Sequence, residues 1–370
     1  MERIRPSLPG SAPPPRPSRR KRLITAGIAL AIVGLTFAFV LPRIADYRAV
    51  WDVVTTLSWL SILALVGATI LNVVTFAPPW MICLPGLSLR RALAVTQAST
   101  ATTYVAPGGA APGMAVSFAM LRAWGYTSRQ VAVTVAVTGV WNQLIIFGSP
   151  PFALALLALI GKHDSILRSF AIVGVVVFGV GLGLFAGGLA SAELARWFGD
   201  TTARVVSRLL RLVRRGPVGF RGETLVRFRR DALDLLRTRW HVLTLGALAG
   251  QLSVFFVLYV TVRVIGIGSG TLLGLEVFAA WSVAKLLGSL PITPGGIGVV
   301  ELGLTSLLVG FGGPKAKVVA AVLVYRFLTV VPTLVLGLVS AVTWRRGHPR
   351  AAVPQQDADE RAGRLTGTRL

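Results

Sequence analysis

The sequence predicts an all-α polytopic membrane protein, and three observations support this prediction. Of the 370 residues, 54% are hydrophobic and only 14% are charged, and the mean hydropathy is +0.71. Apolar runs long enough to cross a bilayer as helices recur along the chain. The Lys and Arg residues, which give a net charge of +24, gather between these runs, as is typical of cytoplasmic loops. No nucleic acid is expected as a partner, because the basic residues follow the topology and no recognised nucleic-acid-binding pattern is present.

The chain divides into a transmembrane domain and two polar tails. Residues 1–22 are rich in Pro, Ser and Arg and are expected to be a disordered, basic cytoplasmic tail. The transmembrane domain covers 23–345, and 346–370 is expected to be a second disordered tail. Within the domain we expect two halves, 23–160 and 169–345, and about six full spans, placed at 23–41, 59–84, 131–160, 169–190, 241–262 and 318–344.

Two predicted spans need separate comment. The first apolar run, 23–41, follows a basic cluster but lacks a convincing cleavage site, so we interpret it as a retained span rather than a signal peptide. The run 131–160 contains Pro150 and Pro151. Two helices there would each be too short to span, so we expect one kinked and tilted helix.

The largest polar segment is a loop over 191–240, with twelve Arg against five acidic residues. Apolar residues recur in it at helical spacing, which suits an amphipathic helix on anionic lipid headgroups of the cytoplasmic leaflet. An ordinary positive-inside loop explains the charge equally well. Both interpretations remain open at this stage.

Two further apolar segments are broken in the middle by Pro and Gly. In 92–121 the break contains Pro107, Gly108 and Gly109, and in 276–311 it contains Pro294, Gly295 and Gly296. Pro removes a backbone donor and Gly disfavours the helix, so each segment must split into two arms. An arm such as 276–290 rises only ~22 Å, which is less than the hydrocarbon core of about 30 Å. Each segment is therefore expected to form a helical hairpin that lines a protected cavity.

The two broken segments reveal an internal repeat. A shift of 187 residues places the first Pro-Gly-Gly block on the second and Val131 on Val318. If all basic loops are cytoplasmic, the halves have opposite orientation, an inverted repeat of the kind found in secondary transporters. The sequence does not distinguish re-entrant loops from hairpins that cross the membrane completely.

Ionisable residues inside apolar segments are the candidate site. A lone charge at the bilayer centre costs at least ~2.5–3.5 kcal/mol, so Lys285, Glu301 and Arg326 should face one another or water. A structural ion pair and a headgroup-binding role are both compatible with this pattern. The first half offers mostly neutral groups. The predicted substrate-binding residues are Lys285, Pro294, Gly295, Gly296, Glu301, Arg326, Pro107, Gly108, Gly109, Arg122 and Asn142.

Several kinds of chemistry have no support in the sequence. Cys83 is the only cysteine, and the three histidines are far apart, so no metal site is expected. No phosphate-binding loop and no nucleophile or paired-carboxylate arrangement is present, so neither a cofactor nor an enzymatic activity is expected.

A family resemblance rests on the second broken segment and the helix after it. The block Leu290-Pro-Ile-Thr-Pro-Gly-Gly-Ile-Gly-Val-Val-Glu301, followed by Arg326 and Pro332, resembles the lysylphosphatidylglycerol synthase transmembrane-domain family, also called flippase-like membrane proteins. The resemblance implies a lipid flippase of the bacterial plasma membrane with both termini cytoplasmic, which moves an anionic or aminoacylated phospholipid between leaflets. Two departures matter. We expect no soluble aminoacyl-transfer domain after the last span, and Gly113-Met114 lacks the acid that the resemblance would lead one to expect in the first hairpin.

An alternative function is a membrane scaffold or regulatory subunit without catalytic activity. The basic loop 191–240 would then dock a cell-envelope lipid enzyme as a partner.

Overall fold

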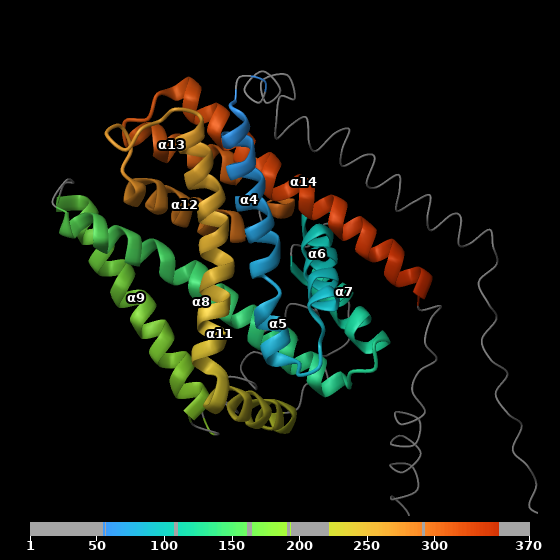
Figure 1. The fold of residues 1–370 in the computed structure, drawn as a ribbon. Helices are drawn as coiled ribbons and strands as arrows, with labels where there is room; N and C mark the ends of the chain where they lie inside the picture. Colours follow the sequence, from blue (N-terminus) through green and yellow to red (C-terminus); the bar gives the residue numbers. More distant parts are fainter. Residues whose placement is uncertain are drawn as a thin grey trace, which may run out of the picture. The chain divides into compact units, whose positions relative to one another are not determined.

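The computed structural model describes residues 55, 57–106, 110–160, 165–190, 193, 222–290 and 293–347, all of which belong to one compact unit. Throughout these ranges the regular structure is helical and no β-strand occurs. The elements, shown in Figure 1, are α4 (Trp59–Thr75), α5 (Pro78–Cys83), α6 (Leu89–Val105), α7 (Ala110–Ala123), α8 (Ser128–Leu159), α9 (Ser165–Ala190), α11 (Gly222–Val264), α12 (Gly274–Ser289), the 3-10 turn η2 (Pro294–Gly296), α13 (Val299–Gly310) and α14 (Lys315–Gly347).

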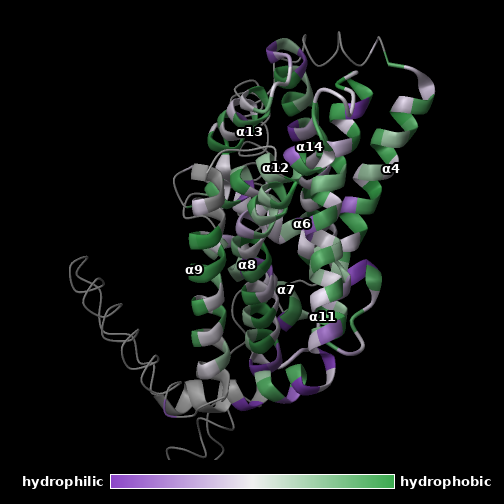
Figure 2. Ribbon diagram, turned by 90° about the vertical axis from the view of Figure 1, so that its left-hand side faces the viewer, coloured by the Kyte–Doolittle hydropathy of each residue, from purple (hydrophilic) through white to green (hydrophobic). Residues whose placement is uncertain are grey.

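Four of the predicted spans are confirmed. Helical stretches at Trp59–Cys83, Ser128–Leu159, Ala232–Val264 and Lys315–Trp344 are long and apolar enough to cross a bilayer. The span predicted at 169–190 lies within the helix α9. The span predicted at 23–41, like both predicted tails, lies outside the described residues. Figure 2 shows hydrophobic residues along most of α4, α8 and α9, which is the surface expected of helices that face lipid.

The second predicted span is not a single helix. Residues 59–84 form α4 and α5, which are separated at Phe76 and Ala77. The cause is the Pro78-Pro79 pair at the start of α5, because proline lacks the N–H that would continue the ladder and its ring clashes with the preceding turn. The mean hydropathy of the segment is high throughout, and the break is therefore invisible to a hydropathy average.

The predicted boundary of the polar loop is also wrong. The helix α11 begins at Gly222, so the C-terminal part of the segment 191–240 is helical and continuous with the following span. Ala232 and Leu236, one turn apart, are buried in a cluster with Cys83 and Val133. Ala232 and Leu236 therefore pack the start of α11 against the rest of the protein, although arginine is the most frequent residue there. The stretch 204–215, where the amphipathic helix was predicted, lies outside the described residues.

The two predicted breaks are present, and each lies between two short helices. The arms α6 and α7 flank the first break, whose residues 107–109 lie outside the described ranges, and α12 and α13 flank the second. A glycine allows the close approach of the arms in both hairpins. A Cβ on Gly113 of α7 would overlap Thr103 Oγ1 and would lie 2.6 Å from Ser99 O, and a Cβ on Gly288 of α12 would overlap Val300 Cγ2.

The 187-residue repeat is visible in the arrangement of the helices. Shifted by 187 residues, the first residue of α8 falls on the first residue of α14, and α4 falls on residues 246–262 within α11. The hairpin helix α6 packs against α14, and its counterpart α12 packs against α8. Figure 1 shows α4 and α11 running in opposite directions, and α8 and α14 likewise. Helices that correspond by sequence are therefore antiparallel in space.

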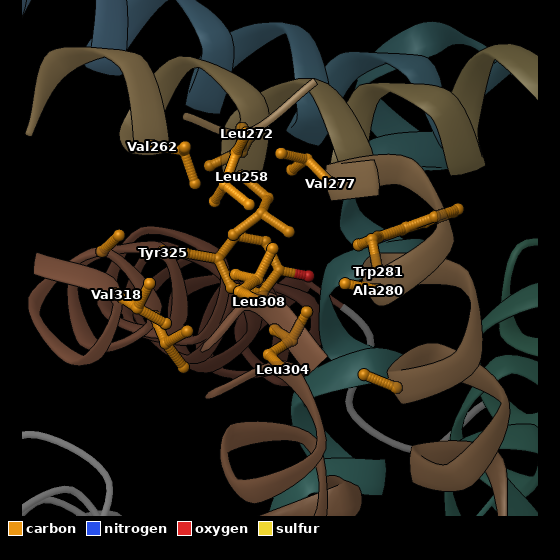
Figure 3. Close-up of a cluster of buried hydrophobic side chains, with 14 of the residues drawn as sticks. Leu258, Val262, Leu272, Val277, Ala280, Trp281, Leu304, Leu308, Val318 and Tyr325 are labelled. Carbon is orange, nitrogen blue, oxygen red and sulfur yellow. The ribbon is translucent and has the colours of Figure 1, made fainter. Parts of the chain in front are cut away.

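Each half contributes a hydrophobic core around its hairpin. One cluster joins α6, α7 and α8 to the segment around α5, and includes Val95, Met120, Leu121 and Val131. The second cluster joins α11, α12, α13 and α14 (Figure 3). Its largest side chains include Trp281, Leu304, Leu308 and Tyr325. The hairpins are thus embedded in protein, which is the condition under which broken backbone is tolerated at membrane depth.

The close packing of the first hairpin can be tested at Gly113. We expect Gly113→Ala to lower the free energy of unfolding by about 1–3 kcal/mol, because the added Cβ must displace Ser99 backbone and Thr103. Gly139→Ala in α8 is the matched control, since a Cβ there meets no atom within 4 Å and helix propensity alone favours alanine by about 0.5–1 kcal/mol. Thermal unfolding in detergent measures both. Equal stability of the two variants would contradict the packing described for α6 and α7.

Candidate functional site at the tip of the second hairpin

Three glycines form the turn between α12 and α13. Gly295, Gly296 and Gly298 have φ values of 62°, 69° and 83°, a region that residues with a Cβ rarely adopt. The turn starts with the 3-10 segment at Pro294 and ends at Gly298, the residue before α13. This turn, residues 294–298, is the tip of the second hairpin. Side chains can form hydrogen bonds with its backbone N–H and C=O groups.

Glu301 occupies the first turn of α13 and is bound from two sides. Its Oε2 accepts a hydrogen bond from the Gly298 N–H at 2.7 Å, and its Oε1 lies 2.5 Å from Arg326 Nε. The two side chains are 14% and 5% exposed, for Glu301 and Arg326 respectively. A carboxylate near a helix N-terminus also interacts favourably with the helix dipole. Of the two ion pairs that the sequence allowed for Glu301, the structure forms the one with Arg326.

Arg326 connects the hairpin tip to the last long helix. Besides the bond to Glu301, its Nη2 lies 3.5 Å from Gly295 O. Arg326 belongs to α14, Gly295 lies within the turn, and Glu301 is in the first turn of α13. One guanidinium therefore links both the turn and the start of α13 to α14.

The tip of the second hairpin also contacts the first hairpin. A Cβ on Gly295 would overlap Cδ1 of Tyr104 and would lie 2.9 Å from its Cε1. Tyr104 belongs to the last turn of α6, next to the first break, and it interacts electrostatically with Arg326. Gly295 in the second break thus lies against Tyr104, which is next to the first break. Because glycine has no side chain, it leaves room for the tyrosine ring.

Lys285 lies near this pair but takes no part in it. The residue is half-buried in α12 and interacts electrostatically with Arg326. Within the described ranges its ammonium group forms no hydrogen bond and no ion pair. The surroundings of the tip therefore contain two basic residues and one carboxylate that is already bound.

Two predicted binding residues of the first half, Arg122 and Asn142, form hydrogen bonds away from the hairpin tip. Arg122, in the last turn of α7, donates from Nη1 to Tyr126 O at 2.8 Å, so it is at the opposite end of α7 from the break. Asn142 Oδ1 accepts a hydrogen bond from Gln251 Nε2 and links α8 to α11. The structure does not bring either residue to the Glu301–Arg326 pair, and their binding roles stay predictions. Pro107, Gly108 and Gly109 lie outside the described residues.

The sequence reasoning missed Tyr104 and Trp281. Tyr104 was one polar residue among several in the first arm, and only its position three residues before Pro107 could have singled it out. Trp281 lies one turn before Lys285 in α12 and is only 2% exposed. Its spacing from Lys285 places both side chains on one face of the helix.

The fold and the site together define a class of protein. Four long apolar helices, two hairpins broken by Pro and Gly, and an ion pair buried at a hairpin tip are the features of a multi-pass α-helical membrane protein with an internal polar site.

The chain belongs to the family described as the lysylphosphatidylglycerol synthase TM region, which it matches over residues 24–337. The match includes both halves, both hairpins and the Glu301–Arg326 pair, and it confirms the resemblance found in the sequence. No curated protein matches the chain.

The energetic role of the buried pair can be measured with a double-mutant cycle. Glu301→Gln alone should destabilise the protein by about 3–5 kcal/mol, because it leaves the Arg326 charge buried without a counter-charge. We expect the double variant Glu301→Gln, Arg326→Met to lose about 1–3 kcal/mol less than the sum of the single variants. The measurement is reversible unfolding in detergent.

The control for this cycle combines Glu301→Gln with Lys317→Met. Lys317 is exposed at the start of α14 and donates to Gly266 O at 3.2 Å, so its substitution should add to Glu301→Gln within about 0.5 kcal/mol. Additivity of Glu301→Gln with Arg326→Met as well would show that the pair contributes no coupling.

Proposed function

We propose that this protein is a lipid flippase or lipid transporter, which moves an anionic or aminoacylated phospholipid between the leaflets of a bacterial plasma membrane. The observation that carries the proposal is the contact between the second break and the end of α6, next to the first break. The tip of the second hairpin, held by Glu301 and Arg326, touches Tyr104 in the last turn of α6. Charged and polar groups therefore meet between the two halves, where transporters built from repeats place their binding sites.

The energetics of the tip favour binding over a purely structural role. A headgroup that crosses a membrane needs polar partners along its path, because each unsatisfied polar group costs several kcal/mol in hydrocarbon. The tip supplies glycine backbone groups, an arginine and a nearby lysine. A scaffold protein would gain nothing from placing a lysine without an ion pair beside such a tip. No enzymatic activity is proposed, since the groups at the tip bind charge and offer no nucleophile with an adjacent base.

We further propose that the two halves have opposite membrane orientation. The antiparallel course of corresponding helices supports this topology, as does the basic sequence between α9 and α11. In this arrangement about six full spans cross the membrane, the termini are cytoplasmic, and α6–α7 and α12–α13 enter from opposite sides. The start of α11 then faces anionic lipid headgroups. Arg230, Arg237 and Arg239 are exposed there, and Trp240 is 57% exposed, as is typical of residues at a membrane interface.

The proposed topology predicts opposite labelling of the two hairpin entries. In a Cys83→Ala background, Ser88→Cys before α6 and Ser269→Cys before α12 should react with a membrane-impermeant maleimide from opposite sides of oriented vesicles, because both positions are exposed. Ser128→Cys at the start of α8 is the control and should react from the same side as Ser88→Cys. Labelling of all three from one side would exclude the inverted topology.

The proposed function predicts a leaflet-exchange defect in Glu301→Gln. Proteoliposomes with wild-type protein should move fluorescent phosphatidylglycerol between leaflets faster than protein-free vesicles, as measured by quenching of the outer-leaflet fluorophore. Loss of a buried charge-assisted contact should slow the exchange by about tenfold or more.

The matched control for this assay is Glu276→Gln. Glu276 also accepts a backbone N–H at a helix start, from Leu273 at 2.7 Å, but it lies at the other end of α12 from the break. Its amide variant keeps an acceptor oxygen and should exchange lipid at the wild-type rate. Equal rates for wild type, Glu301→Gln and protein-free vesicles would refute the proposed function.

A further inference from the structure

A cavity that does not include the hairpin tip lies between the end of α5, the start of α8 and the N-terminal part of α11. Its volume is about 210 Å³. Leu84, Val133 and Leu235 give it apolar walls, and Arg129 and Gln130, which are both exposed, give it a polar wall. We call this cavity the α5 groove. Its walls suit a ligand that is partly apolar and partly anionic.

The surroundings of the α5 groove are basic. Arg239 of α11 is exposed and donates from Nη1 to Ile82 O at 2.9 Å, beside the groove wall. Arg90 and Arg91, which are both exposed, begin α6 a few residues after that wall. The helices α5, α6 and α8 contain no acidic residue, and the exposed acid of α11 in the described ranges is Asp234. Arginines therefore outnumber carboxylates around the groove, and such a surface attracts anions.

The last helix ends at the same end of the molecule as the groove. A Cβ on Gly337 of α14 would overlap Ala101 Cβ and would lie 2.7 Å from Gln97 O, so α14 packs tightly along α6. Trp344, two turns later, packs against the cluster that contains Leu84 of the groove wall. The chain therefore leaves α14 at the end of the molecule that carries the α5 groove.

The sequence after α14 contains the densest group of acidic residues in the chain. Asp357, Asp359 and Glu360 are three of only 14 acids among 370 residues, and no other stretch of four residues holds three. The apolar residues Ala-Ala-Val-Pro, 351–354, precede this group. Asp357 follows the last residue of α14 by ten positions, a length of chain that reaches at most about 35 Å. The segment 351–360 therefore carries the apolar and anionic groups that the α5 groove can hold.

We propose that residues 351–360 dock in the α5 groove, with their apolar part against Leu84 and Val133 and their carboxylates facing Arg129 and Arg239. Charge complementarity favours this occupant. The covalent connection to α14 gives the segment an effective concentration on the order of millimolar, so weak contacts are sufficient. The docked segment covers arginines that anionic headgroups of the membrane would otherwise bind. This inference goes beyond the proposed function and does not depend on lipid movement.

Docking can be measured by cysteine cross-linking in the full-length protein. In a Cys83→Ala background, Pro85→Cys on the exposed wall of the groove is combined with Ala358→Cys in the acidic group, and we call these two substitutions the groove pair. Copper phenanthroline oxidises neighbouring thiols, and the disulfide-linked peptides are quantified by mass spectrometry after digestion. We expect at least about tenfold more cross-link than for Ser269→Cys with Ala358→Cys, because Ser269 is exposed beyond the opposite end of α11.

The charge requirement is tested with a neutral segment in the same groove pair. Asp357→Asn, Asp359→Asn and Glu360→Gln keep the size of the segment, and they leave the helices unchanged because they follow α14. Together they should lower the cross-link by about fivefold, and high salt should also lower it, because both weaken charge contacts. Arg129→Gln should act in the same direction. Lys317→Gln, at the start of α14, is the control and should leave the cross-link unchanged.

Three other results would overturn the inference. The first is equal cross-linking of the groove pair and the Ser269 pair, or no effect of the neutral segment. The second is a disulfide between two copies, seen as a dimer on a gel, which would assign the groove to a second copy of the chain. The third is a cross-link that forms in phosphatidylcholine vesicles and is lost in phosphatidylglycerol vesicles, which would assign the groove to an anionic lipid. We expect the cross-link within one chain in both kinds of vesicle.

Discussion

The ion pair between Glu301 and Arg326 is the constraint on which the second half of the structure depends. Two charges cannot remain apart in an apolar environment, so α13, which carries the carboxylate, must begin where the guanidinium of α14 can reach it. The Gly298 N–H completes the carboxylate's bonding, and the positive φ of Gly298 gives the backbone the turn that precedes α13. Once α13 is fixed, the position of Gly295 follows, and Gly295 is the point at which Tyr104 of the first half makes contact. A local charge requirement thus determines how one half meets the other.

Much of the fold followed from the sequence because its strongest determinants are local. Pro and Gly end helices wherever they cluster, and both breaks lie where the Pro-Gly-Gly blocks predicted them. The repeat was visible for the same reason, since the block and the start of the next helix recur at a fixed shift. Prediction failed where short-range composition hid the decisive residues. The start of α11 looked polar because arginines outnumber the two buried residues, Ala232 and Leu236, that hold it against the rest. The break before Pro78 was not predicted, because the mean hydropathy of residues 59–84 is high on both sides of it.

The candidate site was predicted only in its charged part. The cost of a lone charge in hydrocarbon required partners for Lys285, Glu301 and Arg326, and the structure supplies one for two of them. Tyr104 and Trp281 could not be found in this way, because an aromatic residue in an apolar helix is ordinary core until the tertiary contacts are known. Arg122 and Asn142 show the converse. Their polarity suggested binding, but the hydrogen bonds they make, to Tyr126 and Gln251, lie in other parts of the fold.

The two halves share their helices but differ in charge, and this difference has a physical consequence. Both hairpins pack through a glycine, Gly113 against the Ser99 backbone and Thr103 in one and Gly288 against the Val300 side chain in the other. Only the second hairpin carries ionisable residues next to its break, whereas the first arm of the other is lined with hydroxyl groups and ends in Tyr104. A charged headgroup held between them would be bound strongly on one side and weakly on the other. Separation of the hairpins would then cost only the weak contacts, so the headgroup would remain on the charged hairpin while the first hairpin moved away. Under the proposed function, such an asymmetric site would release a lipid toward one leaflet without breaking the Glu301–Arg326 pair.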